Sequence, residues 1–167
     1  MFNYFTEKGY KVIYKRPKNT EFTLDNNEQS TINQNIGNIS AYVDGTGIIT
    51  DYKLCEYYED VYLFDDIVKQ YPNHTYNEIQ LSLFSNAKGF VSMGGGNGIF
   101  CSLFGKPNIT YVTTSKELRP GYFDGDCYYK KLSNAEVMAV LDPETDIIER
   151  GYRDYEELYK LMKEVFK

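Results

Sequence analysis

The chain has 167 residues, 42% of them hydrophobic and 25% charged, which is typical of a globular domain with a buried core. Its net charge of −6 argues against sequence-independent binding to nucleic acid, because such binding depends on Lys and Arg side chains that neutralise phosphates. No apolar run approaches the roughly 20 residues of a membrane span, and residues 1–6 lack the basic and apolar regions of a signal peptide. We therefore expect a single cytoplasmic domain over residues 1–167.

The first half of the chain predicts three short strands and one helix. Each strand is a short apolar run that ends at charged or turn-forming residues, and the helix begins at a cap formed by Thr50 or Asp51. A further helix is expected to begin near Asp25, inside a polar stretch. The expected strands are residues 10–14, 39–43 and 61–64, and the expected helix covers residues 52–58.

The second half predicts two more strands among helices. Ile79, Leu83 and Phe84 fall on one face of a helix expected over residues 76–87. The expected strands are residues 89–93 and 108–112, with an apolar helical stretch over residues 99–104 between them. An apolar stripe predicts a last helix and consists of Tyr155, Leu158, Tyr159, Met162, Val165 and Phe166.

Strands that alternate with helices favour a parallel sheet covered on both faces. We expect an α/β fold, namely a three-layer Rossmann-like domain with a mainly parallel five-stranded sheet in the order 3-2-1-4-5. Ligands of such sheets bind beyond the carboxyl ends of the strands where the winding reverses, which is here between strands one and four. Lys15 and Arg16 leave strand one at that place, and residues 94–98 leave strand four. We therefore expect both segments to line one crevice.

A glycine-rich run, Gly94-Gly95-Gly96-Asn97-Gly98, connects the fourth strand to the next helix. Without side chains, backbone N–H groups can approach a ligand closely, and the N-terminus of a helix carries a partial positive charge. The pattern favours a site for an anion such as a diphosphate. The same glycines are also compatible with a tight strand-to-helix turn.

Two further residues at the same edge of the sheet are candidate ligand contacts. Asp65 follows the third strand, where it can hydrogen-bond a ribose or a base, or end the strand together with Asp66. Arg119 lies in a long loop after the fifth strand. It can bind a phosphate through charge-assisted hydrogen bonds, or pair with Glu117 or Asp124.

Several familiar signatures do not occur in the chain. The segment Gly96-x-Gly98-x-x-Cys101 departs from the dinucleotide-binding fingerprint and follows the fourth strand rather than the first. No Gly-Lys-Ser/Thr ends the glycine run, which argues against a Walker-type triphosphate site. A hydrolase triad has little support, because there is no Gly-x-Ser-x-Gly elbow and the only histidine, His74, is expected in an exposed loop.

The three cysteines are widely spaced and include no Cys-x-x-Cys pair. This arrangement favours buried thiols in a reducing compartment over disulfides or a zinc site. We therefore expect neither a metal nor a cofactor. The cysteines are Cys55, Cys101 and Cys127.

The stretch from Asn77 to Val112 resembles the nucleotide-sugar half of GT-B glycosyltransferases. The shared order is a helix, a short strand, a glycine-rich turn, a second helix, a Gly-x-Pro and an apolar strand. In this chain residues 83–92 correspond to the first helix and the short strand, and the run from Gly94 to Gly98 corresponds to the turn. Gly105-Lys106-Pro107 is the Gly-x-Pro, and residues 108–112 are the apolar strand. The closing helical part also looks like the C-terminus of that half.

This resemblance implies that the chain is a donor-binding domain for a nucleotide-diphosphate sugar. The diphosphate would lie on Gly94 to Gly98, with Arg16 as the catalytic cation and Lys15 beside it. Both would stabilise the charge that builds up on the leaving nucleotide without a metal ion. Asp65 would contact the base or ribose. A second Rossmann-like half, in a partner subunit or in a longer protein, would supply the acceptor site and any general base.

Two other functions stay open from the sequence. The first is a non-catalytic nucleotide-binding or assembly module, in which the glycine run is architectural. The second is a nucleotide-sugar epimerase-like domain on the same fold. Turnover of a nucleotide sugar without an acceptor would distinguish the epimerase from the transferase.

Overall fold

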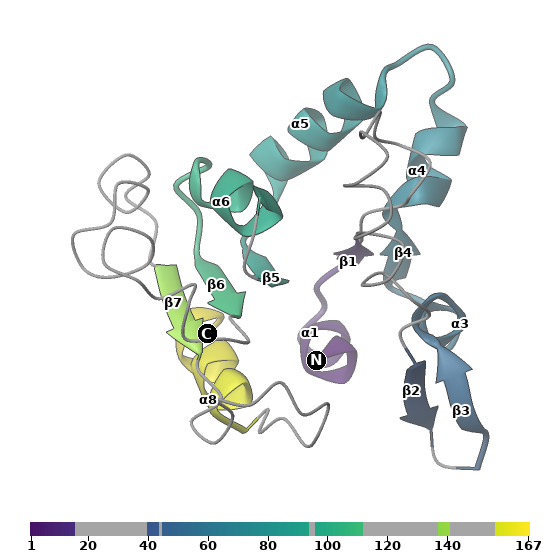
Figure 1. Cartoon of the computed structure of the whole chain (residues 1–167), viewed down its shortest axis with the longest axis vertical. Coiled ribbons are helices and arrows are strands. Elements are labelled where there is room, and N and C mark those ends of the chain that lie inside the picture. The colour runs from purple at the N-terminus through teal and green to yellow at the C-terminus, as the bar shows by residue number, and fades with distance from the viewer. Residues whose placement is uncertain (16–39, 44, 94–95, 112–136, 141–155) are drawn as a thin grey trace, which may run out of the picture. The chain divides into compact units, whose positions relative to one another are not determined.

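The computed structural model describes residues 1–15, 40–43, 45–93, 96–111, 137–140 and 156–167 (Figure 1). These residues form a mixed α/β protein, which confirms the expected fold class. The chain divides into two compact units, Met1–Tyr76 and Asn77–Lys167, and each is described by itself. The single nucleotide-sugar-binding domain stays a prediction. Within the described residues, no helix is long and apolar enough to cross a membrane.

The first unit begins with a short helix and a pair of parallel strands. Helix α1 (Phe2–Glu7) leads into β1 (Val12–Tyr14), which pairs in parallel with β4 (Val61–Leu63). The register places Val12 beside Val61, and the N–H of Val12 donates to the carbonyl of Asp60 at 2.8 Å. Both strands lie within the segments expected from the sequence, whereas α1 was not expected.

A hairpin in this unit corrects the expected strand order. Strand β2 (Ser40–Val43) pairs in antiparallel with β3 (Gly47–Thr50), which was not expected as a strand. Gly45 and Gly47 adopt φ angles of 77° and 86°, a left-handed conformation that favours glycine and lets the chain reverse within a few residues. Strand one therefore pairs with the expected strand three rather than with strand two. The order 3-2-1 is wrong for this part of the chain.

Two short helices complete the first unit. Helix α3 (Asp51–Cys55) begins at the expected cap, where the hydroxyl oxygen of Thr50 accepts the N–H of Lys53 at 3.2 Å. Helix α4 (Phe64–Gln70) follows β4 without an intervening loop. The expectation that Asp65 and Asp66 end a strand is thus corrected, because both lie in the first turn of α4. Carboxylates there are favoured by the helix dipole.

The second unit contains a three-stranded parallel sheet in the order β5-β6-β7. Three of its elements correspond to expected ones: α5 (Tyr76–Asn86), β5 (Phe90–Met93) and β6 (Asn108–Tyr111). Helix α6 (Gly96–Ser102) connects the two strands and begins three residues before the expected helix. Strand β7 (Val137–Val140) was not expected, and α8 (Glu156–Val165) is the expected last helix.

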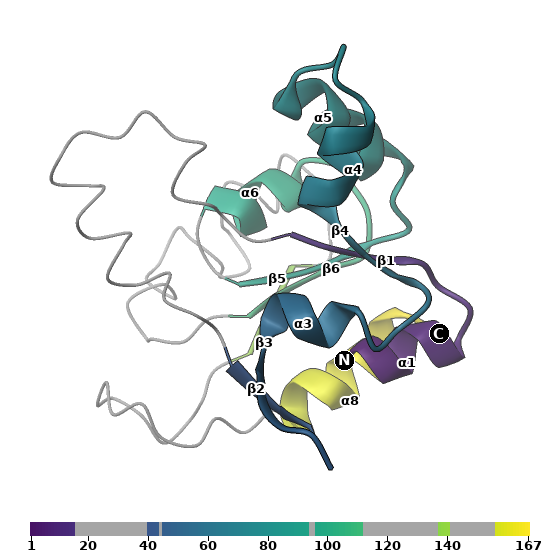
Figure 2. The same ribbon diagram turned by 90° about the vertical axis from the view of Figure 1, so that its right-hand side faces the viewer.

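Helices cover both faces of this sheet. Figure 2 shows α6 and α8 on opposite sides of β5 and β6. On the side of α8, the buried residues Leu158, Met162 and Phe166 recur every fourth residue along the helix. On the other side, Phe90 of β5 contacts the rings of Phe84 and Phe104 at centroid separations of 5.2 and 5.8 Å. The core of the second unit is therefore built on two faces, one of them rich in phenylalanine.

Candidate functional site

The parallel pairing of β1 with β4 brings two predicted site residues to one sheet edge. The register places Tyr14 beside Leu63, so the next residues, Lys15 and Phe64, leave the carboxyl ends of the two strands together. The Nζ atom of Lys15 lies 5.6 Å from the centroid of the Phe64 ring. Asp65 follows Phe64 directly in the first turn of α4. A cation and a carboxylate thus stand at the edge where ligands of parallel sheets bind.

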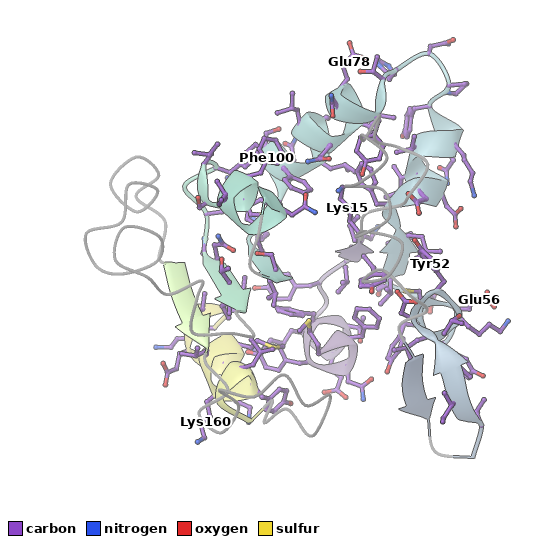
Figure 3. All side chains as sticks on the ribbon, viewed as in Figure 1. Lys15, Tyr52, Glu56, Glu78, Phe100 and Lys160 are labelled. Carbon is purple, nitrogen blue, oxygen red and sulfur yellow. The ribbon has the colours of Figure 1, made fainter. Side chains whose placement is uncertain are left out.

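Two aromatic rings lie close to the ammonium group of Lys15, a residue that Figure 3 labels. Besides Phe64, the ring of Tyr76 lies 5.3 Å from Nζ, and these two rings pack edge to face at 5.0 Å. The distances from Nζ to the two ring centroids are both within the range at which a ring face attracts a cation. Phe64 is 1% exposed, so its position is set by packing. The two rings thus hold the ammonium group near this edge.

Two tyrosine–aspartate hydrogen bonds connect the elements at this edge. The hydroxyl of Tyr14 on β1 donates to Oδ2 of Asp51 at 2.8 Å, which ties α3 to the end of β1. The hydroxyl of Tyr52 on α3 donates to Oδ2 of Asp65 at 3.3 Å, which ties α3 to α4. The rings of Tyr14 and Tyr52 also pack edge to face at 6.5 Å. Asp65 is therefore oriented by a partner from a neighbouring helix.

Removing the Tyr14 hydroxyl is expected to destabilise the first unit. Asp51 is buried, and the Tyr14→Phe substitution deprives its carboxylate of a short hydrogen bond, at a cost of about 1–3 kcal/mol. Urea denaturation followed by circular dichroism measures this loss. Tyr52→Phe is the matched control and is expected to cost less, because its bond is longer and Asp65 is only half-buried. Equal midpoints for Tyr14→Phe and the unsubstituted chain would contradict the assigned role of the bond.

The described part of the glycine run forms the first turn of α6. Gly96, Asn97 and Gly98 are its first three residues, and Gly98 is buried. A Cβ atom built on Gly96 meets no atom within 4 Å, and its φ angle is not in the left-handed region. Neither packing within the described residues nor backbone conformation therefore requires glycine at position 96. The space beside this backbone position is therefore open.

The predicted site residues fall into three groups. Lys15 and Asp65 belong to the first unit and lie at one edge, as described above. Gly96, Asn97 and Gly98 belong to the second unit, so the crevice expected between the two segments stays a prediction. The remaining predicted residues, Arg16, Gly94, Gly95 and Arg119, lie outside the described residues.

Sequence reasoning did not single out the aromatic part of this edge. The sequence does not distinguish Tyr52 and Tyr76 from the many other tyrosines. It suggests the backbone near Phe64, the last residue of an expected strand, as an alternative to Asp65 for contact with a base or ribose, but it indicates no role for the Phe64 ring. The available signal was the position of Phe64, which follows a strand just as Lys15 does. The expected order placed strand two between these residues and so concealed their proximity.

Other chemical centres have little support among the described residues. No group of three or more His, Cys, Asp or Glu side chains there could hold a metal ion. Cys55 and Cys101 are buried, as expected, and form no disulfide, and Cys127 lies outside the described residues. Burial and, to a smaller extent, the charge of Asp51 raise the pKa of the Cys55 thiol to about 11, so it is protonated at neutral pH and a poor nucleophile. His74 is exposed, as expected.

The fold and these contacts define a class of protein but not a family. The chain is an α/β protein with parallel strand pairs and a charged, aromatic edge in its first unit. No protein-family model, curated protein or solved structure matches it.

Proposed function

We propose that the chain binds a nucleotide-diphosphate sugar as the donor-binding part of a glycosyltransferase. The observation that carries this proposal is the placement of Lys15, Phe64 and Asp65 at the carboxyl ends of two paired parallel strands. This edge supplies three kinds of contact that a nucleotide needs: a cation for phosphate, a carboxylate for hydroxyl or base N–H groups, and the half-buried ring of Tyr76 beside the cation, whereas Phe64 is buried and only positions them.

The glycine turn of the second unit supports the same proposal. It joins two parallel strands through a helix, which is the local arrangement in which backbone N–H groups contact phosphates. The open space at Gly96 agrees with close approach of a ligand to the backbone.

Catalysis in this proposal is electrostatic. As the glycosidic bond breaks, the bonding electron pair goes to the leaving phosphate oxygen, and negative charge increases on the diphosphate. Lys15 and Arg16 would stabilise this charge more in the transition state than in the ground state, which lowers the barrier. A second Rossmann-like domain or subunit would bring the acceptor hydroxyl to the anomeric carbon.

Calorimetric titration tests nucleotide binding directly. UDP, GDP, CMP and dTDP, together with their sugar derivatives, would be titrated into the chain. We expect at least one nucleoside diphosphate to bind more tightly than its nucleoside, because phosphate contacts contribute charge-assisted hydrogen bonds. Failure of every compound to bind would overturn the proposed function.

Replacing Lys15 is expected to weaken phosphate binding selectively. Lys15→Gln removes the cation, and the loss of one hydrogen bond to a charged group corresponds to about 1.5–3 kcal/mol, or about 10–150-fold weaker binding of a nucleoside diphosphate. Binding of the nucleoside alone should change little. Lys8→Gln is the matched control, because Lys8 makes the same type of contact with the Tyr4 ring, at 5.2 Å, away from the edge. An equal loss for nucleoside and nucleoside diphosphate would refute the phosphate contact.

A further inference from the structure

A layer of polar side chains lies inside the second unit, on one face of β5 and β6. Ser92 stands beside Thr110 in the register, and Asn108 lies two residues before Thr110, so the three side chains share a face. Asn108 and Thr110 are 0% exposed. The hydroxyls of Ser92 and Thr110 and both polar atoms of the Asn108 amide group are buried without a hydrogen-bond partner in the described structure. Such atoms are costly to bury unpaired, which favours any second state that pairs them.

Helix α6 covers this polar layer. Phe90, on the same face as Ser92, packs against Phe104, which closely follows α6. The opposite face belongs to α8, because a Cβ atom on Gly89 would meet the ring of Phe166. The side of α6 that is buried carries only small residues, and they are Gly98, Cys101 and Ser102. The hydroxyl of Ser102 donates to the carbonyl of Ile99 at 2.6 Å, so it is used within the helix.

The apolar attachment of α6 is concentrated in a phenylalanine cluster, which we define as Phe84, Phe90, Phe100 and Phe104. Five of its six ring pairs have centroids 5.2 to 5.8 Å apart, and Phe100 is the one member that lies on α6 itself (Figure 3). The helix is thus held by aromatic packing on one side, while a polar layer without partners lies beneath its small residues. An attachment of this kind would let α6 move away from β5 and β6 while the cluster keeps it connected.

We propose that α6 is a displaceable cover, and that Ser92, Asn108 and Thr110 beneath it form an uncharged polar subsite for neighbouring hydroxyl groups of a ring. The three side chains offer hydroxyl and amide groups, which both donate and accept hydrogen bonds, as the hydroxyls of a ring do. They include no cation that would compensate a phosphate. The ligand part of this inference rests on the proposed function, in which the ring is either the transferred sugar or the ribose.

Hydrogen exchange of the ligand-free chain tests the displacement independently of any ligand. We expect the amides of Phe100, Cys101 and Ser102 to exchange at least about tenfold faster than those of Ile109 and Thr110, because α6 opens locally. Thr110→Val replaces an unpaired hydroxyl with a methyl group, and it should slow the exchange of α6 by about tenfold and raise the melting temperature by about 2–4 °C. Ser92→Ala should act in the same direction.

The control variant is Ile109→Val, one residue away on the face of α8. It should lower the melting temperature without changing the exchange of α6. Equal protection of the α6 and β6 amides from exchange would overturn the displaceable cover. Unchanged amide exchange of α6 in Thr110→Val and Ser92→Ala would also overturn it. A lower melting temperature for Thr110→Val would indicate that its hydroxyl is already paired, and would also overturn it.

Ligand titration tests the subsite and distinguishes the two sources of hydroxyls. UDP-glucose and GDP-mannose would be compared with UDP and GDP on the unsubstituted chain and on Thr110→Val. If the subsite takes the sugar, Thr110→Val weakens only the nucleotide sugars, by about tenfold; if it takes the ribose, all four weaken equally. No change in any affinity would overturn the subsite alone. Absence of binding to the unsubstituted chain would overturn the proposed function and the subsite, while the exchange experiment still decides the displacement.

Discussion

Replacing Gly89 with alanine is expected to destabilise the second unit strongly. A Cβ atom at this position would lie 2.5 Å from Cε1 of Phe166 and 2.6 Å from the carbonyl oxygen of Pro107. The ring can shift, but the carbonyl accepts the N–H of Phe90 at 2.8 Å at the start of the β5–β6 pairing. Relief of the clash therefore disturbs the sheet itself, and we expect a cost of about 1–3 kcal/mol or more.

The measurement is the urea midpoint of unfolding, with Gly96→Ala as the control. A Cβ atom built on Gly96 has no atom within 4 Å. Alanine at this position should therefore leave the stability unchanged or raise it slightly, because alanine favours the helix. If the backbone at Gly96 contacts a phosphate, the Gly96→Ala variant should bind the nucleotide more weakly without being less stable. An unchanged midpoint for Gly89→Ala would show that the strand and Phe166 are not packed as described.

The second large effect is expected for Phe64→Ala in the first unit. Phe64 is among the least exposed large side chains, and its loss leaves a cavity beside the Tyr76 ring, with an expected cost of about 3–5 kcal/mol. The substitution also removes one of the two rings beside the ammonium group of Lys15 and the edge-to-face partner of Tyr76. Chemical denaturation followed by circular dichroism measures the change.

Phe64→Leu separates packing from the electrostatic effect of the ring. Leucine keeps much of the apolar volume, so most of the stability should return. It has no ring face to attract a cation, so the position of Lys15 should still be disturbed and nucleoside diphosphate binding should remain weaker than in the unsubstituted chain. Full recovery of both properties in Phe64→Leu would show that the ring itself has no role at this edge.

The sequence predicted local elements better than their pairing, and the reason is physical. The apolar runs around Val12, Val61, Phe90 and Ile109 have the period and composition of strands, which are properties of a few consecutive residues. The cap at Thr50 is equally local. Which strand lies beside which depends on packing between distant segments. The left-handed glycines Gly45 and Gly47 were noticed only as the end of a strand, whereas they turn the chain into a hairpin.

The elements that were not expected are short or ambiguous. Helix α1 has six residues, fewer than an isolated helix needs, so tertiary packing of Tyr4 and Phe5 contributes to its stability. The apolar run of β7 has four residues, and such a run does not distinguish a strand from a buried helix. At the candidate site, Lys15 and Asp65 were predicted as contacts from their places after strands. Their aromatic neighbours depended on the pairing of β1 with β4.

The two parallel sheets also differ in how far apart their strands lie along the chain. Val12 pairs with Val61, 49 positions further on, whereas Phe90 pairs with Asn108, 18 positions further on. The entropic cost of closing the longer loop is therefore about 0.9 kcal/mol higher than that of the shorter one. Local pairings form faster than distant ones, so β5 and β6 can associate before the edge that carries Lys15 exists. During folding, the glycine turn of the second unit would therefore be in place earlier than the charged edge of the first unit.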